Sequence, residues 1–174
     1  TLHGGSDGSA VRNWKIVQYK KSMVTFLDKL PDGHMGFPGN LTVETTYKVA
    51  QSTIDIIIEA STDKTTLCNF TNHSYFNLDG TKNIANHKLM VDCDKVLPVD
   101  ENGIPISGPI FAKDLDLDFK TGRTLNNNGK PIEVDHNFCI SNTRQNLRRN
   151  AFVTAKNISL CLLYTSDAAD ESSS

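Results

Sequence analysis

The feature that most constrains the fold is a two-residue alternation of side chains at residues 41–49. Leu41, Val43 and Tyr47 fall on one set of alternate positions, whereas Glu44 and Lys48 fall on the other. This period is typical of a β-strand that has one buried and one solvated face. The β-branched run at 54–60 follows it and predicts a second strand, buried on both faces.

Similar short runs recur along the chain and predict further strands. Turn pairs such as Asp32-Gly33, Asp79-Gly80 and Asn128-Gly129 separate them. No segment keeps a helical 3.6-residue period with caps at both ends, so we expect an all-β sandwich or barrel without internal repeats or a domain boundary. Residues 97–109 and 126–129 are expected to form ordered loops. The other expected strands are 14–19, 23–27, 87–93, 133–140 and 151–159.

Composition excludes several kinds of partner. The net charge of −2 and the pI near 6.2 leave no basic footprint for nucleic acid or an anionic membrane surface. No apolar run approaches the roughly 20 residues of a membrane helix, and no signal-peptide pattern opens the chain. The four cysteines fit no zinc spacing, so we interpret them as reduced thiols of a cytoplasmic protein. Four Asn-x-Ser/Thr triplets carry little weight without a secretion signal.

One stretch carries most of the functional information: residues 70–80, Phe-Thr-Asn-His-Ser-Tyr-Phe-Asn-Leu-Asp-Gly. A strand-like approach at 66–70 leads into it, and Asp79-Gly80 closes it. His73 is thus expected at a strand end, among hydrogen-bonding groups. A histidine side chain has an unperturbed pKa of about 6.5, which suits acid–base chemistry near neutral pH.

Three local patterns, taken in order, resemble the aldose 1-epimerases, also called galactose mutarotases. They are Leu2-His3-Gly4-Gly5, the string from Thr71 to Leu78, and Val134-Asp135-His136-Asn137-Phe138. Trp14 and the segments 36–41 and 97–101 are supporting matches. The resemblance runs from His3 to about Ile158, and the Asn-His-Ser-Tyr-Phe-Asn-Leu string is its most specific part.

The resemblance implies a large antiparallel β-sandwich, the galactose mutarotase-like supersandwich, truncated here at both ends. It also implies an isomerase that needs no metal and no cofactor. Such an enzyme interconverts the α and β anomers of free aldohexoses such as galactose and glucose, so the expected partner is a monosaccharide and a monomer is favoured. The reaction opens the sugar ring with one acid and one base, each typically contributing 10²–10⁴-fold.

Residue by residue, His73 matches the family's general acid, which protonates the ring oxygen. His3 matches a second active-site histidine that hydrogen-bonds the sugar. Asp135, in a run expected to lie on a strand, matches a carboxylate that accepts hydrogen bonds from sugar hydroxyls. The family's Glu base and an upstream Arg have no match, and none of the sequence's glutamates in other contexts is assigned as the base: Glu44, Glu59, Glu101 and Glu133.

We therefore expect an internal fragment that lacks an N-terminal portion and about 100 C-terminal residues, judged against the roughly 300 residues of such enzymes. Residues 1–160 would form a partial aldose 1-epimerase domain. Residues 161–174 resemble the translation of a sequencing-library adapter, and a natural acidic tail is the alternative. A sandwich cut within a sheet exposes strand edges, so the fragment itself is expected to be poorly soluble and inactive.

Other interpretations remain open at this stage. His3 can be a surface residue, Asp135 can bond a neighbouring turn, and His87 and His136 are expected to be structural or exposed. The histidines lack the close spacing of metal ligands, and no glycine-rich loop leads into a helix, which disfavours hexose-phosphate epimerases. A non-catalytic carbohydrate-binding relative is the alternative function. Three aromatic residues are expected in the core, and stacking of a sugar face on such rings is the alternative: Tyr75, Phe76 and Phe138.

Overall fold

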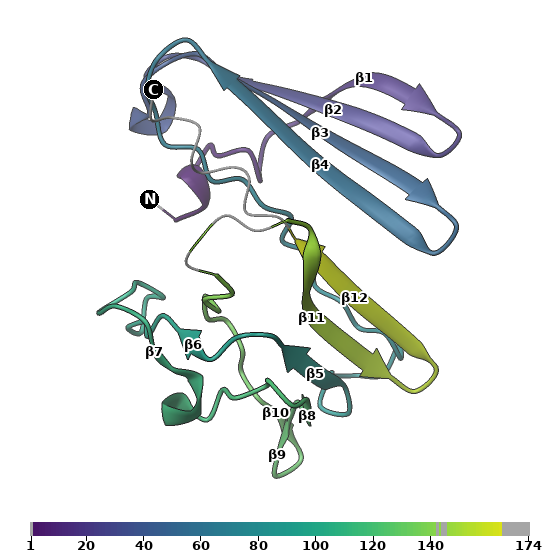
Figure 1. Ribbon diagram of the computed structural model, residues 1–174. Coiled ribbons are helices and arrows are strands. Elements are labelled where there is room, and N and C mark those ends of the chain that lie inside the picture. Colours follow the sequence, from purple (N-terminus) through teal and green to yellow (C-terminus); the bar gives the residue numbers. More distant parts are fainter. Residues whose placement is uncertain (1, 142, 144–145, 165–174) are drawn as a thin grey trace. The chain divides into compact units, whose positions relative to one another are not determined.

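The computed structural model describes residues 2–141, 143 and 146–164. They form two compact units, one spanning 2–74 and the other 75–164. Every strand pair in both units is antiparallel, as the all-β prediction requires (Figure 1). Within the described residues, helices are limited to short 3-10 turns, and none has the length and apolar character to cross a bilayer.

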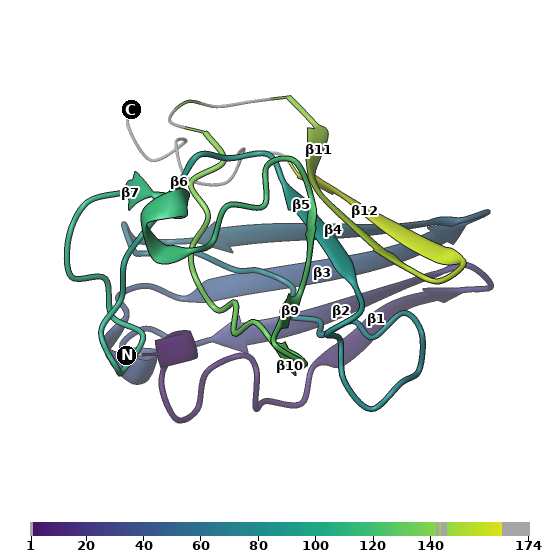
Figure 2. The same cartoon turned by 90° about the horizontal axis from the view of Figure 1, so that it is seen from below.

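The first unit is built on one four-stranded sheet in the order β1-β2-β3-β4 (Figure 2). Its strands are β1 (Lys15–Lys20), β2 (Met23–Leu30), β3 (Leu41–Ala50) and β4 (Thr53–Thr62). The strand predicted at 41–49 is confirmed, and Leu41 and Val43 are buried on one face of β3. Val49, which the alternation places on the same face, is 52% exposed. The register pairs Phe26 with Thr45 and Asp28 with Val43. We call the face that these four side chains and Tyr47 share the pocket face.

The prediction that 54–60 is buried on both faces is wrong. β4 ends the sheet order, and no further strand pairs with it among the described residues. Its side chains are largely exposed, with Ile54 63% exposed. β-branched residues favour the extended backbone wherever a strand lies, so the run specified a strand but not its neighbours.

Two carboxylates fix the connection between β2 and β3, which contains the 3-10 turn η2 (His34–Gly36). Asp32 accepts a 2.6 Å hydrogen bond from the Gly39 amide and pairs with Lys64 beyond β4. Asp63 accepts hydrogen bonds from the amide and the side chain of Asn40, both 2.7 Å long. The bond from Lys64 and then that from Gly39 lower the pKa of Asp32.

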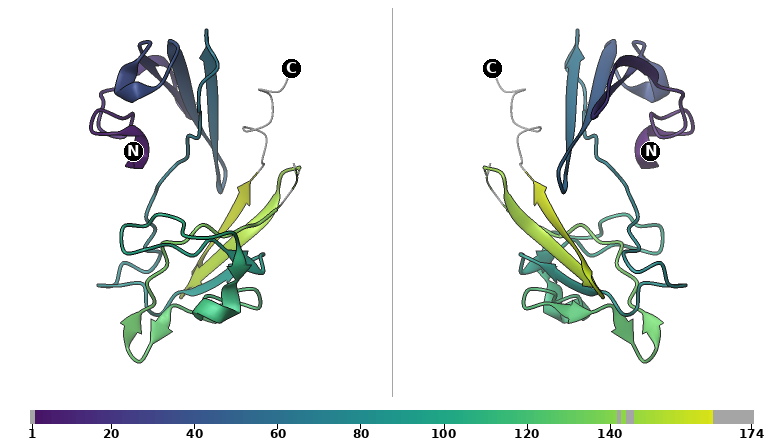
Figure 3. Two further views of the ribbon diagram at one scale, coloured as in Figure 1. Left: turned by 90° about the vertical axis from the view of Figure 1, so that its left-hand side faces the viewer. Right: turned by 90° about the vertical axis from the view of Figure 1, so that its right-hand side faces the viewer.

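The second unit contains a four-stranded sheet in the order β12-β11-β5-β8 and two two-stranded pairs, β6-β7 and β9-β10. Its buried core includes Val96 and Phe119, which is 1% exposed. The β11-β12 hairpin is the longest strand pair of this unit (Figure 3). The elements are β5 (Lys88–Val91), β6 (Lys95–Val96), β7 (Ile110–Phe111), η3 (Ala112–Leu115), β8 (Arg123–Thr124), β9 (Asn126–Asn127), β10 (Lys130–Pro131), β11 (Arg148–Ala155) and β12 (Ile158–Tyr164).

The strand predicted at 151–159 is instead a hairpin. Ala155 pairs with Ile158, so Lys156 and Asn157 form a two-residue turn, and Lys156 adopts a φ of 48°. Asparagine beside a positive-φ residue is a turn signal that the alternation hid. Residues 161–164 belong to β12, and the rest of the proposed tail lies outside the described residues.

The strand predicted at 133–140 does not form either. Only Phe138 pairs there, in a single bridge to Val96, flanked by hydrogen bonds that join Leu97 to Asn137 and Cys139 to Lys95. Residues 132–137 lie outside any strand because the short β6 partner offers them no continuing ladder. The loop at 97–109 is ordered as expected, since the Asp100 carboxylate accepts hydrogen bonds from two amides, those of Asn102 and Ile104.

Candidate functional site

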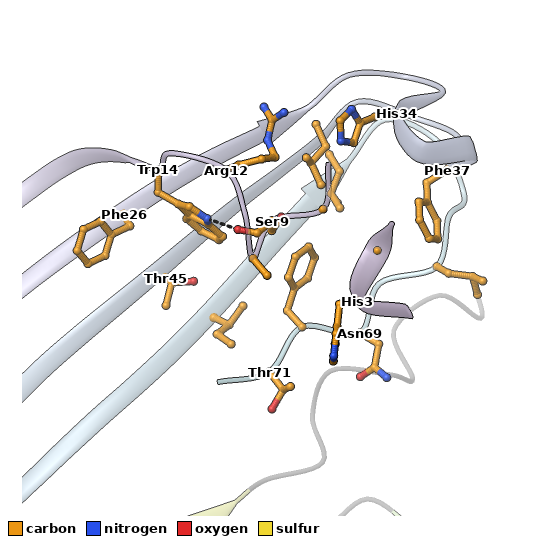
Figure 4. Close-up of a pocket in the computed structure, with 18 of the residues that line it drawn as sticks. His3, Ser9, Arg12, Trp14, Phe26, His34, Phe37, Thr45, Asn69 and Thr71 are labelled. Atoms are coloured by element: carbon orange, nitrogen blue, oxygen red, sulfur yellow. Dashed lines mark hydrogen bonds between the residues drawn. The ribbon is translucent and has the colours of Figure 1, made fainter. Parts of the chain in front are cut away.

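A pocket of about 1000 Å³ lies against the sheet of the first unit (Figure 4). Its floor is the pocket face, including Phe26, Thr45 and Tyr47. The loop at 3–14, the connection between β2 and β3 and the segment at 66–73 form the other walls. The lining combines aromatic and apolar residues with a large share of polar ones, among them three histidines, so it offers hydrogen-bond partners to a small organic ligand.

The two histidines predicted as catalytic meet in this pocket. The ring centroids of His3 and His73 are 5.7 Å apart, and their planes cross at 84°. Both side chains are exposed. Residues 70 positions apart in sequence are thus neighbours, and both rings can reach a ligand in the cavity.

His73 is not at the end of a strand, contrary to the prediction. Residues 65–77 contain neither helix nor strand. Asn72 holds this segment instead: its side-chain nitrogen donates to the Tyr47 hydroxyl of β3 at 3.1 Å, and its oxygen accepts from the Ser74 amide at 3.2 Å. Asparagine side chains compete with ladder hydrogen bonds in this way. The bond to Tyr47 fixes the backbone beside His73 to the pocket face.

His3 lies in the 3-10 turn η1 (Leu2–Gly4) with an unusual backbone. Its φ of 53° falls in the left-handed region, which non-glycine residues adopt at a cost. Gly4 and Gly5 continue the turn at φ 82° and 95°. The Gly8 amide then donates to the Gly5 carbonyl at 3.1 Å, and a Cβ atom on Gly8 would lie 2.4 Å from the His3 carbonyl oxygen. The loop therefore folds tightly back on the histidine.

A buried carboxylate that the sequence prediction missed holds this loop to the sheet. The Asp28 side chain is 4% exposed on the pocket face of β2. It accepts hydrogen bonds from the Ser9 hydroxyl at 3.0 Å and from Arg12 Nε at 3.1 and 3.2 Å. The bond to Asp28 raises the pKa of Arg12, which also pairs with Asp7 at 2.9 Å. Asp28 directly follows the strand predicted at 23–27, so no local pattern marked it as an inward position of β2.

The Ser9 backbone is held as well. Trp14 Nε1 donates to the Ser9 carbonyl at 2.8 Å, and Figure 4 shows the indole reaching across to it. This contact gives Trp14, a supporting match in the sequence, a structural role. On the far side of the loop, His34 Nε2 lies 2.8 Å from the Asp7 carbonyl oxygen. The loop is therefore tied down at three separate residues.

Asp135, the predicted sugar ligand, belongs to the second unit and is exposed in the stretch without strand structure. His87 is buried and accepts a hydrogen bond from the Leu78 amide at 2.9 Å, which is a structural role. Tyr75 and Phe76 are 88% and 54% exposed, so their expected core positions are wrong. The core prediction for Phe138 is confirmed, because it packs against Phe119 with ring centroids 6.1 Å apart.

Comparison with known proteins identifies the family. A sequence model of the family described as Aldose 1-epimerase matches residues 1–170. Aldose 1-epimerase of Escherichia coli is 40% identical over 126 residues, covering 71% of this chain and 36% of that protein. Galactose mutarotase of Mus musculus is 34% identical over 161 residues, covering 83% of this chain and 44% of that protein.

Two solved structures share the fold. An aldose epimerase homologue from C. elegans matches with a TM-score of 0.78 and 28% identity, covering 89% of this chain and 49% of that one. Galactose 1-epimerase from Lactobacillus acidophilus matches with a TM-score of 0.74 and 25% identity, covering 89% and 48%. The chain spans less than half the length of these relatives. A family match over 170 of 174 residues leaves one conclusion: the chain belongs to the aldose 1-epimerase family.

Proposed function

We propose that the full-length protein containing this sequence is an aldose 1-epimerase that interconverts the α and β anomers of free aldohexoses such as galactose and glucose. The observation that carries the proposal is the His3–His73 pair, 5.7 Å apart in a pocket of about 1000 Å³. Membership of the aldose 1-epimerase family supplies the reaction class. The four free thiols favour a cytosolic location.

The reaction is a pair of proton transfers around one carbon atom. A base removes the proton of the anomeric hydroxyl while an acid protonates the ring oxygen, and the bond between the anomeric carbon and that oxygen breaks. The open aldehyde rotates about its first carbon–carbon bond, and the reverse transfers close the ring on the other face. Acid and base must therefore stand on opposite sides of the anomeric centre.

In this proposal His73 is the acid at the ring oxygen, and His3 hydrogen-bonds the sugar beside the reacting centre. Asp135 accepts hydrogen bonds from sugar hydroxyls. The base is a glutamate in the remainder of the full-length protein. Two contacts support the assignment to His73: the bond from Asn72 to Tyr47, and the edge-on contact with the His3 ring. Both limit where the imidazole can lie, as general acid catalysis requires.

Polarimetry of freshly dissolved α-galactose and α-glucose tests the proposal. The full-length protein is expected to speed the drift to equilibrium rotation, and His73→Asn is expected to lower kcat by on the order of 10²–10⁴-fold. Arg123→Gln removes contacts that lie within the second unit, the ion pair with Asp116 and the cation–π contact with Phe119, so it is the control and should keep wild-type kcat. An unchanged rate in His73→Asn removes that residue from the mechanism.

Binding must be measured alongside turnover. If the full-length protein binds galactose in calorimetry but leaves the mutarotation rate at the buffer value, it is a carbohydrate-binding relative rather than an enzyme. If it neither binds nor turns over either sugar, free aldohexoses are not its ligands.

A further inference from the structure

We propose that Asp28 and Arg12 are positioning residues that hold His3 in its working conformation. The inference rests on the proposed function, because it assigns the two residues to the same reaction. Neither residue belongs to the motifs that identify the family in this sequence. Hydrogen bonds and one close backbone contact connect the buried carboxylate to the histidine, all of them within the first unit.

Asp28 is a buried carboxylate that anchors the loop at 3–14. A carboxylate buried on a sheet is costly unless it is paired and fully hydrogen-bonded. Asp28 lies opposite Val43, which is fully buried, and it accepts bonds from Ser9, Arg12 and the Lys29 amide. Both of its side-chain donors come from the loop at 3–14. The charge on β2 therefore acts as the anchor of that loop.

Arg12 bonds to the protein and is not turned toward a ligand. Arg12 borders the pocket, where a free guanidinium would suit sugar hydroxyls. Each of its three nitrogen atoms already donates, however: Nε to Asp28, Nη1 to Asp7 and Nη2 to the Lys29 carbonyl. These bonds turn the guanidinium toward the protein. Arg12 is consequently a link between loop and strand.

Two short turns connect the anchored residues Ser9 and Arg12 to His3. The Val11 amide donates to the Gly8 carbonyl at 3.0 Å, and the Gly8 amide donates to the Gly5 carbonyl at 3.1 Å. Gly8 is packed so closely on the His3 carbonyl that it has no space for a methyl group. A shift at Ser9 or Arg12 is therefore passed to the backbone of His3 through two short turns.

The backbone of His3 itself is strained. A left-handed φ at a non-glycine residue persists only when its surroundings enforce it. Flexible glycines follow at positions 4 and 5, so the loop has an easy route to relax. Loss of the anchor should release the His3 backbone and end its edge-on contact with the His73 ring.

Two readouts in the full-length protein test this. Asp28→Asn is expected to lower kcat by up to the order of 10²-fold. In a His3→Asn background it should cause little further loss, because it acts through His3. The ring carbon–proton NMR signals of His3 and His73 should move in Asp28→Asn, whereas those of buried His87 should not. Val91→Ala, a core truncation in the second unit, is the control for lost stability and should leave both histidine signals and kcat unchanged.

Three results overturn the inference. The His3 and His73 signals stay in place in Asp28→Asn, or Asp28→Asn lowers kcat as much in the His3→Asn background as it does alone. The third is that Val91→Ala causes the same signal changes. If the wild-type protein shows no mutarotation at all, the proposed function fails instead. The histidine signals alone then decide the positioning role, since they require no turnover.

Discussion

A methyl group added at Gly8 should destabilise the protein far more than the same change at Gly108. The new Cβ would meet three backbone atoms: the His3 carbonyl oxygen at 2.4 Å, the Gly4 carbonyl carbon at 3.1 Å and the Gly5 oxygen at 3.2 Å. Backbone cannot rotate away as a side chain can, so the loop must move. Overpacking of this kind costs about 1–3 kcal/mol, and the 2.4 Å contact puts Gly8→Ala in the upper half of that range.

Gly108→Ala is the matched control. It makes the same chemical change, its φ also lies outside the left-handed region, and its Cβ would meet nothing within 4 Å. At Gly108 the substitution acts only by restricting the unfolded chain, which stabilises the folded protein by about 0.4–1 kcal/mol. Gly8→Ala stiffens the unfolded chain in the same way, so this gain cancels between the two variants. Their unfolding free energies should therefore differ by the overpacking cost alone, about 2–3 kcal/mol.

Urea unfolding of both full-length variants, followed by circular dichroism, measures that difference. Equal midpoints for Gly8→Ala and Gly108→Ala would refute the close packing of the loop on His3. A loss confined to Gly8→Ala, accompanied by moved His3 ring signals, would support it.

Three further predictions concern stability and thiol chemistry. Phe119→Ala removes a ring that is 1% exposed and should cost about 3–5 kcal/mol in urea unfolding; a loss near zero would contradict the core position. The pKa of Asp32 is lowered in the folded protein, so its ion pair with Lys64 stabilises the fold at pH values above 3.8, the pKa of the carboxyl in the unfolded chain. This stabilisation is lost as the pH falls below 3.8 and through the lower pKa of the folded protein. The urea midpoints at pH 7 and pH 3 should thus differ less in Asp32→Asn than in the wild type. An equal difference in both proteins would show that the ion pair does not contribute to the pH dependence of stability. With a chromogenic disulfide reagent, exposed Cys161 should react in the native protein, whereas Cys93, whose pKa is raised chiefly by burial, should react only after urea is added.

The sequence predicted the strands of the first unit well because their signals are local. Alternation marked β3, and the strand predicted at 23–27 lies within β2, which continues to Leu30. It failed where pairing depends on distant partners. β4 has the composition of a central strand but lies at an edge, and 133–140 has the composition of a strand but meets only the two residues of β6.

The site was predictable only through its motifs. His3 and His73 were named from family-like strings, and their contact confirms that the two strings meet. Asp28 and Arg12 were missed because an acidic residue in a strand and a basic residue in a loop are common surface features. Their importance arises from burial and from hydrogen bonds across 16 positions, which no local pattern encodes.

The two anchors of the histidines have a consequence for the order of folding. Asp28 and Tyr47 lie on β2 and β3, which are consecutive strands and pair along their whole length. Such hairpins close in about 1–10 μs. Contact between residues 3 and 73 instead closes a much longer loop, whose entropy cost must be met first. The hairpin should therefore act as a template that forms early, onto which the N-terminal loop and the His73 segment dock later.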